Sequence, residues 1–241
     1  MKKAFPITAL LLSACWRHSG IPPLPVAIPD AADSSQVALA RALAPVLYVQ
    51  RDEFFPLERV VAVLHPSRPV IAYHLDWKWD VNGQWAPWAR SSDAEEIWVG
   101  YDSVSRAPTD LWTYWHGTVL HTSWRGKGQP AISVQWGKHG SLPHGVIESD
   151  LPRAKTLNVM YASSYVLLPD IWLGRLIHGG PWGFFHSYAR YRDFSRVVPL
   201  DQKLSAVVRT ADARAALRAV FGKRYAGKAS WPTAPLPGSA P

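Results

Sequence analysis

The stretch Ser92-Asp93-Ala94-Glu95-Glu96-Ile97-Trp98-Val99-Gly100-Tyr101 decides the fold class. We predict a strand from Glu95 to Tyr101, because β-branched and aromatic residues favour strands. Similar short runs precede and follow it, and the glycine, proline and asparagine residues between them favour turns. The pattern therefore predicts a mostly β chain, with further strands at 46–49, 60–64, 70–77, 111–124 and 131–136.

Three connecting regions carry specific expectations. Asn82-Gly83 is a turn signal typical of hairpins. The long aromatic run from Leu111 to Trp124 is expected to form one strand with a bend at Gly117. Residues 165–195 hold glycine, proline and aromatic residues in irregular order, which indicates long loops.

Two helices are expected at the ends of the β region. Ser34 or Ser35 is a suitable cap for a short helix that ends near Leu43, and Thr210 is a suitable cap for a helix over 211–221 that ends at Gly222. The sum is an antiparallel β-sandwich, jelly-roll-like, with two packed sheets, a C-terminal helix and long loops. We expect residues 35–225 to form this single domain.

The first fourteen residues have the composition of an export signal. Lys2 and Lys3 give a positive start, an apolar run extends from Ala4 to Leu12, and the small residues Ser13-Ala14 come directly before Cys15. The apolar run is too short to span a bilayer, which needs about 20 residues. We therefore interpret residues 1–14 as a signal peptide.

Leu12-Ser13-Ala14-Cys15 resembles the bacterial lipobox. The resemblance implies that Cys15 carries a diacylglyceryl group, and more than one acyl chain gives a lasting membrane anchor. The alternative is an ordinary secretory leader with a cysteine there by chance. Cys15 is the only cysteine of the chain, so no intramolecular disulfide forms. Trp16 follows it rather than Asp, and similarity to Gram-negative lipoproteins then favours the outer over the inner membrane.

Low-complexity segments flank the predicted domain. Residues 15–34 are rich in proline, alanine and serine, and are expected to form a flexible tether between lipid and domain. Residues 226–241 are rich in proline and alanine, and are expected to be a disordered tail.

The charge of the chain points toward anionic partners. The leader holds two lysines and no acid, so the remainder keeps +6 of the formal charge of +8. A basic balance suits nucleic acid, anionic lipid or acidic glycan, and export makes nucleic acid the least expected. Solubility alone is the alternative reading of the charge. The thirteen tryptophans fit either core packing or binding at a sugar or lipid interface.

Asp93 and Glu95 form the best candidate for a chemical site. They stand two apart, so they point to the same face of a strand. Two carboxylates this close repel each other unless a cation or a proton lies between them, and Ca²⁺, Mg²⁺ and Mn²⁺ prefer such oxygen ligands. The alternative is a solvated pair at a strand end.

Histidines supply further candidates. His74 and Asp76 share a strand face in the same way. Gly137 and Gly140 flank Lys138-His139, so the backbone is expected to turn sharply there and expose the imidazole. His116 lies in an aromatic strand, where a packed histidine with a satisfied hydrogen bond is the commoner case.

Three phrases of the sequence resemble the Vps62-like family and the necrosis- and ethylene-inducing (NPP1-type) proteins. They are Ala44-Pro45-Val46-Leu47-Tyr48 followed by Asp52-Glu53-Phe54-Phe55-Pro56, then Asp93-Ala94-Glu95 running into Ile97-Trp98-Val99, then His139-Gly140-Ser141. Their order and spacing agree with the family over roughly residues 42–145. The resemblance implies a β-sandwich with a divalent-cation site at one end. Asp93 and Glu95 would be its first ligands, joined by an upstream acid that Asp76 loosely matches and by a histidine, for which His139 is the candidate.

The sequence also departs from the NPP1 motif. Ser92 stands where that motif has histidine, Ala94 replaces its tryptophan, and the heptapeptide GHRHDWE is absent. Toxin activity is therefore not carried over.

Three functions remain open at this point. The first is a non-enzymatic envelope lipoprotein in which a cation near Asp93 and Glu95 helps to bind a lipid or glycan headgroup. The second is a metal-assisted hydrolase of phosphoesters or glycans with His139 as acid or base; the chain holds no Gly-x-Ser-x-Gly, His-Glu-x-x-His or P-loop motif. The third is a purely structural lipoprotein.

Overall fold

The structure is a computed structural model, and it describes residues 27–51, 53, 55–78, 93–115, 118–146, 194–222 and 230–232. The predicted signal peptide, Cys15, most of the tether and the Asn82-Gly83 turn lie outside these residues, as do His116 and nearly all of 165–195. None of the helices formed by the described residues has the length and apolar character needed to cross a membrane.

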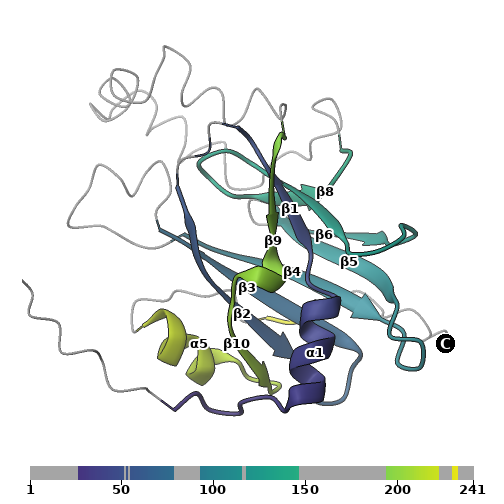
Figure 1. The fold of residues 1–241 in the computed structure, drawn as a ribbon, viewed down its shortest axis with the longest axis vertical. Coiled ribbons are helices and arrows are strands. Elements are labelled where there is room, and N and C mark those ends of the chain that lie inside the picture. Colours follow the sequence, from purple (N-terminus) through teal and green to yellow (C-terminus); the bar gives the residue numbers. More distant parts are fainter. Residues whose placement is uncertain are drawn as a thin grey trace, which may run out of the picture.

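The described residues form two open sheets (Figure 1). The larger sheet has six strands in the order β10 (Leu204–Arg209), β2 (Leu57–Leu64), β3 (Val70–Trp77), β4 (Asp93–Tyr101), β5 (Pro108–Trp115) and β6 (Thr118–Ser123). The smaller sheet has four strands in the order β8 (Ser141–Pro143), β7 (Ala131–Val134), β1 (Val46–Val49) and β9 (Arg196–Pro199). The predicted mostly β class is confirmed, and the arrangement is consistent with a β-sandwich.

The sheets are mixed rather than purely antiparallel. Strands β2 to β6 pair antiparallel with their neighbours in sequence, but β1 pairs parallel with β7 and β10 pairs parallel with β2. The prediction of antiparallel sheets is wrong at these two pairs. Short connections require antiparallel neighbours, whereas strands joined by long connections can pair in either direction.

The expected bent strand over 111–124 is instead a hairpin. Strands β5 and β6 pair antiparallel, and Trp115 is the partner of Thr118. Two residues, 116 and 117, connect them, which is the shortest common hairpin connection. Pairing the two halves of the run satisfies their backbone groups against each other, which a single bent strand does not do.

Helix α1 (Ser34–Ala42) begins where expected but has a different cap. The Asp33 carboxylate accepts the N–H of Gln36 at 2.9 Å, and the Gln36 side chain accepts the N–H of Asp33 at 3.1 Å. This reciprocal pair is a capping box, so Asp33 replaces Ser34 and Ser35 as the N-cap.

Helix α5 (Arg214–Phe221) begins three residues later than predicted. Thr210 does not cap it, because its hydroxyl oxygen accepts the N–H of Asp212 at 3.2 Å and closes a turn before the helix. The helix ends at Gly222 as predicted, with a φ of 90°.

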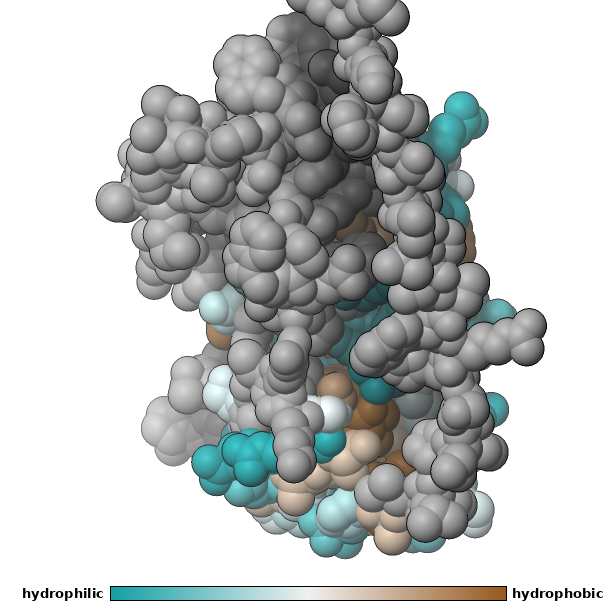
Figure 2. Space-filling view, turned by 90° about the vertical axis from the view of Figure 1, so that its left-hand side faces the viewer, coloured by the Kyte–Doolittle hydropathy of each residue, from teal (hydrophilic) through white to brown (hydrophobic). Residues whose placement is uncertain are grey.

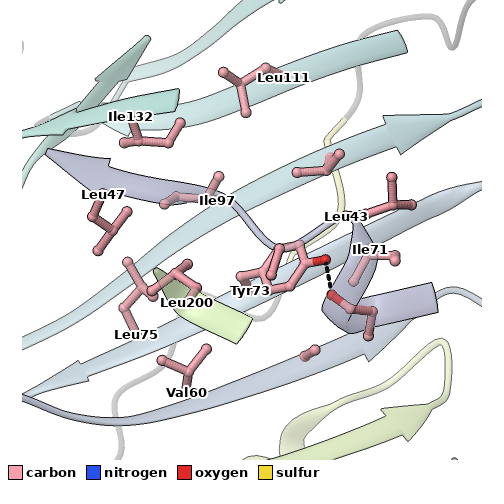
Figure 3. Close-up of a cluster of buried hydrophobic side chains, with 14 of the residues drawn as sticks. Leu43, Leu47, Val60, Ile71, Tyr73, Leu75, Ile97, Leu111, Ile132 and Leu200 are labelled. Carbon is pink, nitrogen blue, oxygen red and sulfur yellow. Dashed lines mark hydrogen bonds between the residues drawn. The ribbon is translucent and has the colours of Figure 1, made fainter. Parts of the chain in front are cut away.

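Alternation along the strands of the six-stranded sheet fills two apolar clusters, one on each face. The first lies between the sheets and is shown in Figure 3, where Tyr73 points toward α1 and its hydroxyl donates to the carbonyl of Ala40 at 2.8 Å. The second lies under α5 and includes Trp98, Trp112 and Leu217. Because both faces are covered, all eight residues of β3 are buried.

Residues 230–232, within the segment expected to be disordered, contact the second cluster. The indole N–H of Trp231 donates to the carbonyl of Ala211 at 2.9 Å, and Trp98 donates to the carbonyl of Ser230 at 3.2 Å. On the side of the molecule drawn in Figure 2, hydrophobic residues gather in the lower centre, with hydrophilic residues beside them. The rest of the predicted tail lies outside the described residues.

Candidate functional site

A buried histidine, His139, lies at the centre of the candidate site. The loop between β7 and β8 turns tightly, with left-handed φ values of 68° at Gly137 and 55° at His139. The N–H of His139 donates to the carbonyl of Gln135 at 3.0 Å, which closes the turn. The predicted sharp turn is confirmed, but the predicted exposure is wrong, because the imidazole is directed inward and is 0% exposed.

Two carboxylates face the two ring nitrogens of His139. Nδ1 lies 2.7 Å from Oδ2 of Asp93, at the start of β4, and Nε2 lies 3.7 Å from Oε2 of Glu53. Burial on its own lowers the pKa of His139, but the hydrogen bond to Asp93 and the interactions with Glu53 outweigh it and raise the pKa to about 9. At neutral pH the site therefore holds an imidazolium between two carboxylates.

Glu53 fixes this arrangement from the segment that follows β1. One carboxylate oxygen accepts the N–H of Phe55 at 2.9 Å, and the other accepts the N–H of Gly137 at 2.6 Å. Sequence reasoning did not choose Glu53 as a site residue. It does stand in the Asp52-Glu53 phrase used for the family resemblance, which is the one signal that could have found it.

Aromatic rings complete the surroundings of the imidazolium. The ring of Trp77 stacks on His139 with centroids 4.1 Å apart and an interplanar angle of 3°. Phe55 presents its edge at 5.9 Å and 85°. A desolvated cation over a tryptophan face is attracted by the ring quadrupole, so Trp77 stabilises the charged form of His139. We call Glu53, Asp93, His139 and Trp77 the His139 cluster.

Two of the other predicted site residues occupy different positions relative to this cluster. Glu95 lies two residues after Asp93 on the same strand and is buried, at 6% exposed. Asp76 lies on the opposite face, because it pairs with Ala94 in register and alternates with Trp77. Its carboxylate accepts Arg59 Nε at 2.9 Å, and Arg59 also donates to the carbonyl of Val220 in α5. The prediction that Asp76 converges with the others is therefore wrong.

His74 lies on the face of Asp76, not with the His139 cluster. Its Nε2 is 3.4 Å from Oε1 of Glu96, its partner in the adjacent strand. Burial lowers the pKa of His74 to about 3, so this histidine is neutral at physiological pH. His74 and His139 thus carry different charges although both are buried, because two carboxylates oppose the effect of burial at His139.

The described residues contain no group of three or more His, Cys, Asp or Glu side chains arranged to hold a metal ion. In the His139 cluster, Nδ1 of His139 is hydrogen-bonded to Oδ2 of Asp93. A cation that used both atoms as ligands would have to displace the proton of this hydrogen bond. The expected Ca²⁺, Mg²⁺ or Mn²⁺ site stays a prediction.

None of the comparisons with family models, curated proteins and solved structures gives a match. The resemblance to the Vps62-like and NPP1-type proteins therefore also stays a prediction.

Proposed function

We propose that the chain is a lipid-anchored protein of the cell envelope whose β-sandwich is a non-catalytic binding domain for an anionic lipid or glycan headgroup. The observation that carries this proposal is the distribution of charge between interior and surface. Within the part of the chain that the structure describes, five acidic residues are buried: Glu53, Asp76, Glu95, Glu96 and Asp110. No lysine or arginine among the described residues is buried.

This asymmetry makes the surface more basic than the net charge indicates. The buried carboxylates have internal partners, for example Arg59 at Asp76 and His139 at Glu53. Their charge therefore offsets little of the potential created by arginines and lysines at the surface. A basic surface raises the local concentration of anionic groups and speeds association with them.

The His139 cluster favours a binding domain over a hydrolase. A general acid or base must come within roughly 2.6–3.2 Å of the substrate proton. His139 is 0% exposed and faces two carboxylates, whereas the Asp93 side chain is 19% exposed. The cluster joins the segment after β1, the start of β4 and the loop after β7, so its geometry suits holding these segments together.

The first experiment tests the anchor. The full chain is expressed with its leader in a Gram-negative host with labelled palmitate, beside Cys15→Ala. We expect label and membrane fractionation for the natural sequence and no label for the variant. Equal fractionation of both chains without label would contradict the anchor.

The second experiment tests the anionic partner. The purified lipidated chain is placed in neutral phosphatidylcholine nanodiscs and mixed with fluorescent vesicles that contain either phosphatidylcholine alone or added phosphatidylglycerol. We expect capture of the anionic vesicles only, with capture lost near 1 M salt, where the Debye length is about 3 Å. Equal capture of both vesicle types would refute an electrostatic headgroup interaction.

A further inference from the structure

A cavity of about 840 Å³ opens beside helix α1. The helix is labelled in the lower half of Figure 1. Its wall is formed by α1, the β2–β3 connection, the β4–β5 connection and the end of β10. Cavities of about 300–1,000 Å³ are typical of small-molecule sites. This cavity lies apart from the His139 cluster, and no residue of that cluster lines it.

Three arginines from separate segments line the cavity. Arg68 comes from the β2–β3 connection, Arg106 from the β4–β5 connection and Arg209 from the end of β10. None of the described residues that line the cavity is Asp or Glu. Three positive residues and no described acid in the lining give the cavity a positive potential, which favours an anion.

Two acids in the segments beside these arginines, Asp33 and Asp102, accept local hydrogen bonds of their own. Asp33, whose charge is felt by Arg209, accepts Ser35 Oγ at 2.7 Å and Gln36 N at 2.9 Å as the cap of α1. Asp102 accepts Val104 N at 3.0 Å within the β4–β5 connection. Both carboxylates are exposed, so water screens their effect on the cavity.

His65 adds a polar but uncharged group to the wall. Burial, followed by the nearby charge of Arg68, lowers the pKa of His65. Its Nδ1 accepts the N–H groups of Ser67 and Arg68, each at 3.1 Å, so the ring proton is on Nε2. Neutral His65 and the hydroxyl groups of Ser67 and Ser103 are hydrogen-bond partners that leave the positive charge of the cavity unchanged.

Two of the three arginines are restrained, one by a carbonyl of the cavity wall and one by a ring outside the cavity. Arg209 donates to the carbonyl of Pro66, and the Arg68 guanidinium lies 5.5 Å from the centroid of the Trp231 ring. Arg106 has a left-handed φ of 61°, which is uncommon for arginine. Side chains that are held before binding lose less conformational entropy when a ligand arrives.

We propose that this cavity binds the phosphate group of a small anionic ligand through Arg68, Arg106 and Arg209. The planar guanidinium fork matches phosphate oxygens in a bidentate manner, and serine hydroxyls can donate to the remaining oxygens. Leu39, Leu64 and Tyr101 supply an apolar part of the wall for the remainder of the ligand. The inference rests on the proposed function for its anionic partner and names the chemistry and the place of binding.

Two sources can present this phosphate, and two arms of one experiment separate them. Lipidated full chain in phosphatidylcholine nanodiscs is titrated calorimetrically with inorganic phosphate and with glycerol 3-phosphate, with sodium acetate as the reference anion. In parallel, the same nanodiscs are mixed with vesicles that contain phosphatidate. Binding in the first arm indicates a free phosphorylated solute, and binding in the second arm alone indicates a lipid headgroup.

The variants are Arg106→Asn and Arg209→Gln, and the control is Arg125→Gln, an exposed arginine outside the cavity. Asparagine tolerates a left-handed φ, so Arg106→Asn removes the charge without new backbone strain. Losing one charged hydrogen-bonding partner is expected to weaken phosphate binding about tenfold or more. Arg125→Gln should bind as the natural chain does, and thermal melting of every variant verifies folding.

Absence of binding in both arms, or equal binding by Arg106→Asn and the natural chain, overturns the inference. These failures differ from a failure of the proposed function. If phosphatidylglycerol vesicles are captured equally by the natural chain and the cavity variants, the proposed function stands and the cavity assignment falls. If soluble phosphate binds but neither lipidation nor vesicle capture is observed, the cavity assignment stands and the proposed function falls.

Discussion

Replacing His139 by asparagine is the most informative single perturbation of the His139 cluster. Asparagine tolerates the left-handed backbone at this position, so the change removes the positive charge with little added strain. It leaves Asp93 and Glu53 facing each other without the cation between them. Removing one partner of a buried ion pair typically costs about 3–5 kcal/mol.

The pKa of His139 gives an independent magnitude. A rise from 6.5 to about 9 on folding corresponds to about 3 kcal/mol of stability, since each pKa unit is worth about 1.36 kcal/mol. Because the pKa is raised, this contribution is fully present below pH 6.5 and is lost as the pH rises through about 9. The stability difference between the natural chain and His139→Asn should therefore be about 3 kcal/mol at pH 6 and should shrink toward pH 10.

The assay is urea unfolding of the full chain followed by tryptophan fluorescence, at several values of pH from 6 to 10. Taking the difference between the two chains cancels groups that titrate equally in both. Arg125→Gln is the control, because Arg125 is an exposed charged residue away from the cluster, and it should change stability by less than about 1 kcal/mol. A difference between the natural chain and His139→Asn that is under about 1 kcal/mol, or that stays constant with pH, would refute a buried imidazolium.

Three further predictions concern other parts of the molecule. Arg59→Gln leaves Asp76, which is 0% exposed, without its guanidinium partner. Because Arg59 is itself 38% exposed, the substitution should lower the free energy of urea unfolding by about 2 kcal/mol. A loss no larger than that of Arg125→Gln would contradict this role. Gly222→Ala places a side chain at a φ of 90° in open space and should cost about 1 kcal/mol or more of unfolding free energy; an unchanged urea midpoint would mean that the end of α5 is not under this constraint. If His139 is a ligand of the expected cation site at Asp93 and Glu95, binding of Ca²⁺, Mg²⁺ or Mn²⁺ must release the His139 proton and become tighter as the pH rises toward 9. Calorimetry in two buffers of different ionisation enthalpy measures the proton release. Absence of both a binding heat and a thermal shift would reject the site.

Local pattern predicted the strands well, and the reason is periodicity. Strands β1 and β3 have the predicted bounds, because turn residues on both sides of a run of β-branched and aromatic residues mark where the strand begins and ends. The predicted N-cap residues of the two helices are wrong, because several neighbouring polar residues can accept the same backbone N–H groups. Asp33 rather than Ser34 caps α1, since only Asp33 stands three residues before Gln36 and completes the reciprocal pair.

The sequence by itself determined which segments are strands and which residues alternate along them, because these properties depend on neighbours a few positions away. Tertiary structure decided where the functional groups meet. The register of β3 against β4 separates Asp76 from Asp93, and a turn after β7 carries His139 inward to Glu53, 86 positions earlier in the chain. Arg68, Arg106 and Arg209 are scattered in the sequence and line one cavity, because strand pairing brings the ends of β2, β4 and β10 to the same end of the sheet. Such convergence depends on contacts between distant segments, and no local pattern encodes it.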